Sequence, residues 1–62
     1  MTPKFVLKKA GEEFHFVLKA RNGETILQSE TYVSKQGAIN GIASIKENAP
    51  IAILEDLTQE KV

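Results

Sequence analysis

Cysteine and tryptophan are absent from this chain, and histidine occurs only once, as His15. Without cysteine, disulfide bonds and thiolate metal sites are excluded, and a reducing cytoplasm is the compartment that we expect. One histidine does not make a metal centre without several well-placed carboxylates, so we expect neither a metal nor a cofactor. Small domains usually need a disulfide, a metal or a partner subunit. Of these three, only the partner subunit remains.

The length of the chain also indicates that it needs a partner subunit. The chain has 62 residues, which is room for one domain spanning residues 1–62. A domain of this size buries only about 60% of the surface that its unfolded chain exposes, so its independent stability is marginal. We therefore expect the chain to associate with itself.

Net charge and long apolar runs are also lacking. Eight basic and eight acidic residues cancel, which argues against a dedicated nucleic-acid binder. The charges are unevenly placed: residues 1–21 hold five basic and two acidic groups, and residues 47–62 hold four acidic groups and one basic. No apolar run approaches the roughly 18 residues of a membrane span, and the N-terminus lacks the apolar core of a signal peptide. We expect no contact with a membrane.

Alternating apolar and polar residues predict three strands, at 4–9, 14–20 and 25–32. Residues 10–13 form the first predicted turn, and Asn22-Gly23 favours a two-residue type I′ turn between the second and third strands. In these registers Leu7 faces Phe16 and Leu18 faces Leu27. Both hairpins then place their apolar residues on the same face, which supports an antiparallel meander.

A helix is predicted from Ser34, a good N-cap, to about Asn48, before Ala49-Pro50. Its two glycines, one turn apart, each cost about 1 kcal/mol relative to alanine. A close backbone approach to the sheet or to another helix would compensate for this, and two exposed, tolerated glycines are the alternative. The residues assigned to this close packing are Gly37, Asn40 and Gly41, with Asn40 predicted to hydrogen-bond to a partner backbone.

The segment IAIL, residues 51–54, predicts a short fourth strand. A strand that follows a helix needs a sheet edge to pair with, and a chain this small offers few. Folding back onto its own sheet is the monomeric alternative.

The sheet face opposite the helix carries an apolar patch rimmed by cations. In the predicted registers Val6 lies opposite Val17, and Ile26 lies opposite Lys19 beside them. Such a patch suits an acidic protein, another dimer or single-stranded nucleic acid, and an ordinary solvated face is the alternative. The candidate binding face comprises Lys4, Val6, Lys8, His15, Val17, Lys19, Ile26 and Tyr32.

Two groups of residues resemble catalytic sets. His15 is predicted opposite Glu30, and Tyr32 lies near Ser34 and Lys35. We interpret the first as a solvated cross-strand pair and the second as a packed ring followed by a helix cap. The sequence offers no nucleophile–base pair, metal cluster or phosphate loop, so we predict that the protein is not an enzyme.

Several segments resemble the YegP-like family, a family of small bacterial proteins without an established activity. The similarity lies in FVLKA followed by NGE at 16–24 and in ILQSETYVSKQGAINGIASIKENA at 26–49. The family pattern falls on Lys19, Ala20, Asn22, Gly23, Ser29, Glu30, Tyr32, Ser34, Lys35, Asn40, Gly41 and Ile42. Thr31, where the family often has glycine, and Gly37 depart from it.

The resemblance implies an α+β fold built as a β-β-β-α-β unit with one helix packed on one face of the sheet. Some members carry two tandem units, and single-unit members form the equivalent homodimer by exchanging their C-terminal strands. The exchanged strand here is Ile51, Ala52, Ile53 and Leu54. We therefore predict a non-catalytic homodimeric interaction or accessory module, with itself and an unidentified protein as partners. A nucleic-acid-binding module that uses the basic open face is the alternative.

Overall fold

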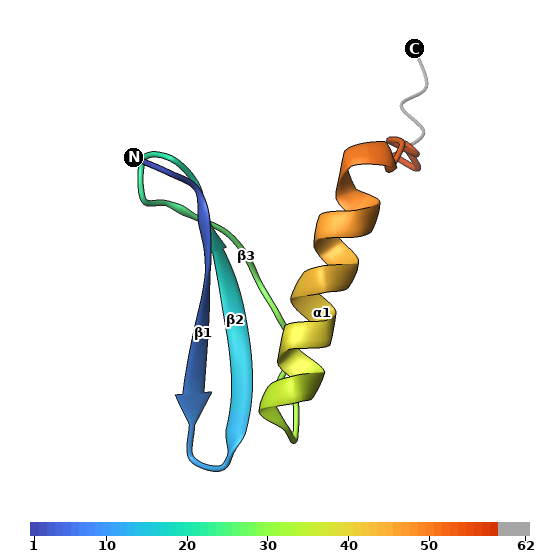
Figure 1. The fold of residues 1–62 in the computed structure, drawn as a ribbon. Helices are drawn as coiled ribbons and strands as arrows, with labels where there is room; N and C mark the ends of the chain where they lie inside the picture. The colour runs from blue at the N-terminus through green and yellow to red at the C-terminus, as the bar shows by residue number, and fades with distance from the viewer. Residues whose placement is uncertain (59–62) are drawn as a thin grey trace.

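The computed structural model describes residues 1–58, which form three strands and one α-helix. The elements are β1 (Lys4–Ala10), β2 (Glu13–Lys19), β3 (Thr25–Gln28), α1 (Lys35–Asn48) and a 3-10 turn, η1 (Ala49–Ile51). The strands make one antiparallel sheet in the order β1-β2-β3, and α1 lies on one of its faces (Figure 1). The α+β class and the meander are thus confirmed.

The first hairpin has the predicted register. Leu7 pairs with Phe16, Phe5 with Leu18, and Lys9 with Phe14. The turn between β1 and β2 contains Gly11 at a φ of 64°, a left-handed conformation that glycine adopts without a steric penalty. The side chains of Phe5, Leu7, Phe14, Phe16 and Leu18 therefore share the inner face, toward the helix.

The second turn is one residue longer than predicted. The Ala20 N–H donates to the Glu24 carbonyl at 2.8 Å, so three residues separate the paired ends, and Gly23 adopts a φ of 90°. A bulge between Leu18 and Lys19 cancels this shift, and Leu18 still faces Leu27 as predicted. Because the bulge leaves Ile26 as the extra residue, Lys19 pairs with Thr25 and not with Ile26.

Tyr32 lies on the inner face, and its predicted place on the open face is wrong. β3 ends at Gln28, and the chain returns to β2 in a single bridge between Phe14 and Tyr32. Ser29 still faces Phe16, whose N–H donates to its hydroxyl at 2.9 Å. Two residues, 30 and 31, then span the position opposite His15. The predicted register had only one residue, Glu30, at this position. The additional residue displaces the predicted His15–Glu30 pair and places the Tyr32 ring on the same face of the sheet as Phe14.

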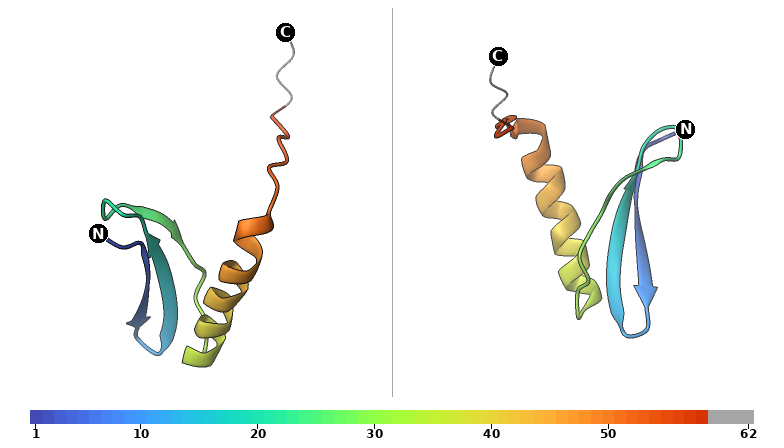
Figure 2. Two further views of the ribbon diagram at one scale, coloured as in Figure 1. Left: turned by 45° about the horizontal axis from the view of Figure 1, so that its top comes forward. Right: turned by 180° about the vertical axis from the view of Figure 1, so that it is seen from behind.

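Helix α1 begins and ends as predicted. The Ser34 hydroxyl accepts a hydrogen bond from the Gly37 N–H at 3.0 Å, and the helix stops at Asn48 before Pro50. Its N-terminal half lies near the sheet, and its C-terminal half inclines away (Figures 1 and 2). Ile42 and Ile45 on that second half are only half-buried.

No strand forms over residues 51–54 in the part of the chain that the structure describes. After η1 the backbone is irregular and runs away from the sheet, as Figure 2 shows. The predicted fourth strand is therefore wrong for the single chain, because no sheet edge lies beside this segment.

The core is small and centres on one aromatic ring. Among residues 1–58 only Phe16, Val17 and Ala38 are buried apolar residues. The Phe16 ring meets Phe5 edge-on at 5.9 Å between centroids and stacks on Tyr32 at 6.0 Å.

The two helix glycines face this aromatic cluster. A Cβ at Gly41 would lie 2.5 Å from the Tyr32 hydroxyl oxygen and 3.2 Å from Cε2 of Phe16. A Cβ at Gly37 would lie 3.2 Å from Oγ of Ser34 and 3.5 Å from Cδ2 of Tyr32. The helix therefore approaches the Tyr32 ring closely. The sequence had predicted that it would approach the small inner-face residues Ser29 and Thr31 instead. At Gly41 the helix lies too close to this ring to admit a side chain.

Gly41→Ala should destabilise the fold by about 1 kcal/mol. Alanine improves helix propensity by about 1 kcal/mol, but overpacking against two stacked rings costs about 1–3 kcal/mol. Tyr32→Phe removes the hydroxyl that the new methyl group meets, so the double variant should be more stable than the two single changes predict together.

Urea unfolding at a fixed protein concentration measures these differences. Gly37→Ala is the matched control, since its Cβ would meet one tight contact, 3.2 Å from Oγ of Ser34, in place of the 2.5 Å contact at Gly41. It should destabilise less than Gly41→Ala or leave stability unchanged. A Gly41→Ala protein as stable as the wild type would contradict the close packing.

Candidate functional site

Three cross-strand pairs occupy the open face of β1 and β2, opposite the helix. They are Lys4 with Lys19, Val6 with Val17, and Lys8 with His15. An apolar pair thus separates two pairs of basic residues. Two lysines directly opposite each other, as Lys4 and Lys19 are, destabilise a sheet, so this pair is not explained by the stability of the single chain. It indicates a surface suited to an anionic group.

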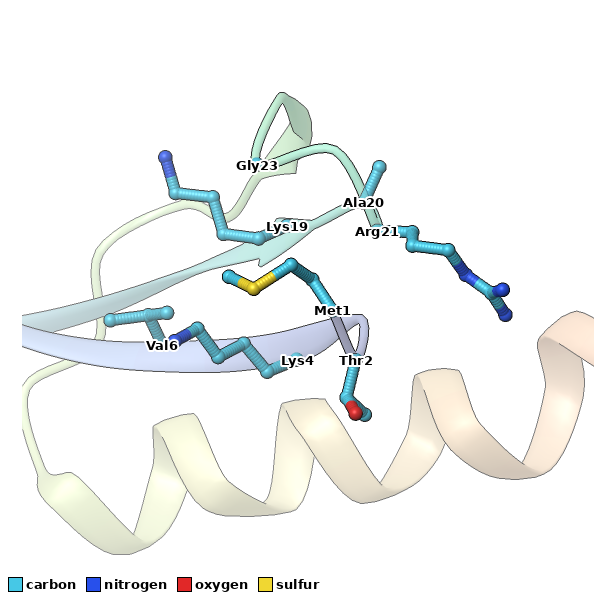
Figure 3. Close-up of a pocket in the computed structure, with 8 residues that line it drawn as sticks. All are labelled: Met1, Thr2, Lys4, Val6, Lys19, Ala20, Arg21 and Gly23. Carbon is cyan, nitrogen blue, oxygen red and sulfur yellow. The ribbon is translucent and has the colours of Figure 1, made fainter.

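A cavity of about 330 Å³ lies at the Lys4–Lys19 end of this face. Its lining consists of Met1, Thr2, Lys4, Val6, Lys19, Ala20, Arg21 and Gly23 (Figure 3). The Lys19 ammonium donates to the Thr25 hydroxyl at 2.8 Å. No carboxylate lines the cavity, whose floor is apolar and whose charged groups are all basic. An anion that carries an apolar group matches both features.

The structure brings together only part of the predicted binding face. Lys4, Val6 and Lys19 line the cavity, and Lys8, His15 and Val17 continue along the same two strands, where Val17 is buried and not part of the exposed face. Ile26, displaced into the bulge, has 59% of its surface exposed. Tyr32 is absent from the face because it stacks on Phe16, so the imidazole of His15 is the one aromatic ring of the described strands that lies there.

Sequence reasoning missed the contributions of Met1, Thr2, Ala20, Arg21 and Gly23 to the cavity. The last three belong to the turn after β2, whose length was predicted one residue too short. The one available signal was Arg21, which belongs to the basic surplus of residues 1–21.

The C-terminal segment exposes an unusual amount of apolar surface. The exposed fractions are 77% for Ile51, 88% for Ile53, 90% for Leu54 and 74% for Leu57, and Ala52 is also exposed. Leu57 was not singled out from the sequence. Soluble chains seldom leave several large aliphatic side chains together in water, so this segment is a candidate contact surface.

Two acidic residues, Glu55 and Asp56, interrupt these apolar ones. The carboxylate of Asp56 accepts hydrogen bonds from the Thr58 hydroxyl at 2.6 Å and from the Thr58 N–H at 2.9 Å. The side-chain hydrogen bond, followed by the backbone one, lowers the pKa of Asp56 below its ordinary value. This carboxylate is therefore charged at neutral pH.

The remaining predicted residues have local roles. Asn40 accepts a hydrogen bond from Gln36 at 3.0 Å within its own helix, so its contact with a partner backbone stays a prediction. Ser34 caps α1, and Tyr32 packs against the core. No three His, Asp or Glu side chains in residues 1–58 gather closely enough to hold a metal ion. Within the same range, α1 is too short and too polar to cross a membrane.

Relatives with this fold are known. A family model described as Domain of unknown function (DUF1508) matches residues 9–56. A UPF0339 protein of Shewanella oneidensis is 57% identical over 44 residues, which are 71% of this chain and 40% of the relative. UPF0339 protein YegP of Escherichia coli K12 is 58% identical over 43 residues, which are 69% of this chain and 39% of the relative. The chain thus spans about two fifths of the length of these curated relatives.

A solved structure extends the comparison to an archaeal protein. The NMR solution structure of a protein from Haloferax volcanii matches with a TM-score of 0.76 and 34% sequence identity. The match covers 87% of this chain and 93% of that one. On the family model and these identities, the chain belongs to the YegP-like family of uncharacterised proteins.

Proposed function

We propose that the chain is a non-catalytic homodimeric interaction module of the cytoplasm, in which each copy completes the sheet of the other with residues 51–54. The observation that carries this proposal is the contrast between a core of three buried apolar residues and a C-terminal segment of exposed ones. A chain without disulfides that buries so little needs another source of stability. A second copy supplies it.

Half-buried surface on the inner face supports the same conclusion. Phe5 and Leu7 on β1 are half-buried, and so are Ile42 and Ile45 on α1. Fully burying an aliphatic or aromatic side chain stabilises by about 1.5–3 kcal/mol relative to its exposed state. An added strand would also pair the free edge of β1, whose backbone groups have no partner strand within residues 1–58.

The lengths of the relatives fit this arrangement. Because 44 matched residues are 40% of the Shewanella oneidensis protein, that protein has about 110 residues, enough for two such units. The Haloferax volcanii protein matches over nearly its whole length and is therefore the size of one unit. A homodimer of single units would be the counterpart of a tandem pair.

Truncation after Asn48 tests the proposal. Light scattering on the full-length protein should give the mass of a dimer at micromolar concentration. The truncated chain should lose the dimer and unfold or aggregate, because folding and association are linked when the core is shared. A full-length monomer would overturn the exchange, and a truncated chain that remains dimeric would place the interface elsewhere.

Replacing Ile53 and Leu54 by serine provides a matched variant of full length. It should weaken the dimer as truncation does. Replacing Thr58 by serine in the same segment should have no effect on the mass.

Nucleic-acid binding is the second candidate, and the run of basic pairs along the open face favours it. The position of Tyr32 on the inner face of the sheet argues against nucleic-acid binding. Binding modules for single strands usually stack bases on the rings of Phe, Tyr or Trp, and the described part of this face has none of these three residues. The open face then suits an unidentified acidic protein better than a nucleic acid.

A fluorescence anisotropy titration with a labelled single-stranded oligonucleotide at low salt decides between the two candidates. For the favoured module we expect no saturable binding. Saturable binding that weakens steeply with added salt and is reduced by Lys8→Glu would support the nucleic-acid candidate instead.

A further inference from the structure

The cavity on the open face is formed by the folded hairpin itself. Its lining residues come from two segments of the chain, 1–6 and 19–23. Backbone hydrogen bonds hold the second segment in shape: the Ala20 N–H donates to the Glu24 carbonyl at 2.8 Å, and the Gly23 N–H donates to the Ala20 carbonyl at 3.0 Å. The cavity is therefore complete within one copy of the chain, as small-molecule sites usually are before their ligand binds.

Among residues 1–58, no carboxylate lines the cavity to balance its basic groups. Lys4 and Lys19 lie directly opposite each other, and Arg21 adds a third positive charge. Glu24, although close in the sequence, is not part of the lining. The Lys19 ammonium donates to the Thr25 hydroxyl, which uses one of its three N–H groups and adds no negative charge. An anion between the two lysines would remove their repulsion and accept charge-assisted hydrogen bonds from them.

The size and the floor of the cavity indicate an organic ligand. Val6 and Ala20, both half-buried, give it an apolar floor. Its volume of about 330 Å³ is at the lower end for small-molecule sites and equals about eleven water-sized volumes of roughly 30 Å³ each. The Met1 side chain lies between those of Lys4 and Lys19 in Figure 3. Because Met1 is 91% exposed and its thioether is flexible, it can pack over an apolar group. A bare inorganic anion would leave most of this space unfilled.

We infer that this cavity binds a small carboxylic acid with an apolar tail, of about ten non-hydrogen atoms in all. The carboxylate lies between the ammonium groups of Lys4 and Lys19. The tail rests on Val6 and Ala20, beneath the Met1 thioether. This ligand site goes beyond the proposed interaction module. It does not depend on the dimer, because all of the lining residues belong to one copy.

Titration of the full-length, ¹⁵N-labelled protein with octanoate tests the site. Octanoate combines one carboxylate with a linear alkyl tail and has the size that the cavity admits. Two-dimensional ¹H–¹⁵N spectra should show saturable shifts at the amides of Lys4, Val6 and residues 19–23, with a dissociation constant of about 1 mM or lower. Shifts confined to α1 and to residues 51–57 would place the binding on other apolar surface and overturn the inference.

Two further ligands separate the charge from the tail. Acetate has the carboxylate without the tail, and octanol has the tail without the charge. Each should bind at least about tenfold more weakly than octanoate, because each makes only part of the contact. Acetate that binds as tightly as octanoate would mean that the basic groups recognise charge alone, as an acidic protein surface would provide it. Octanol that binds as tightly would mean that apolar contact alone is recognised. Either result would overturn the inference.

Two double variants test the position of the carboxylate. Lys4→Gln with Lys19→Gln removes two charges that line the cavity, so the dissociation constant of octanoate should rise about tenfold or more. Lys8→Gln with Lys9→Gln is the matched control, since it removes two charges from β1 outside the cavity. Its dissociation constant should stay within about twofold of the wild type, because salt screens the more distant charges. Equal losses in the two variants would indicate an effect of net charge alone and would contradict the proposed position.

The comparison of three ligands on the wild type keeps the inference testable if a variant fails to fold, because it needs no substitution. A wild-type protein that shows no saturable shifts with octanoate would overturn the ligand site and leave the proposed homodimer standing.

Discussion

The contact between the helix and the sheet depends on the ring of Phe16. This ring is buried between Phe5, Tyr32 and the glycine side of α1, and it lies on the central strand. Because Gly41 has no side chain, the helix backbone approaches within van der Waals distance of the two stacked rings. The N-terminal half of α1 is thereby fixed, and the C-terminal half inclines away from the sheet. Farther along the helix, the Lys46 ammonium still lies 6.0 Å from the centre of the Phe5 ring.

The packing around Phe16 leaves much of the apolar surface uncovered. The inner faces of β1 and of the second half of α1 remain half-buried, and the segment after the helix projects into solvent. In a larger domain further elements of the same chain would cover such surface. In the dimer proposed above, a second copy of the same elements would cover it. The shortage of core is thus the physical origin of the proposed dimer.

Much of the fold was predictable because its local signals are strong. Alternation over β1 and β2 fixed the first hairpin, and Ser34 and Pro50 marked both ends of the helix. The second turn was mispredicted because Asn-Gly also suits a longer loop with glycine at a positive φ. Tyr32 was placed on the wrong face because the extra residue at 30–31 inverts the alternation, and no local pattern encodes it. The departure at Thr31 from the family's frequent glycine lies at this point.

The candidate site was predictable to a similar extent. The lysines and valines of the open face follow from strand periodicity, and the structure groups several of them around one cavity. Arg21 and Gly23 join the cavity through the shape of the turn, which the sequence did not specify. The proposed fourth strand would depend on a surface outside residues 1–58, so residues 51–54 alone do not decide its conformation.

An isotope-filtered NOE experiment on a mixture of labelled and unlabelled protein tests the shared sheet most directly. Only contacts between copies give signals in such a spectrum. The account predicts intermolecular NOEs between the methyl groups of Ile53 or Leu54 and the side chains of Phe5, Val6 or Leu7. A filtered spectrum without these signals, from a sample whose Ile53 and Leu54 contact only their own chain, would contradict it.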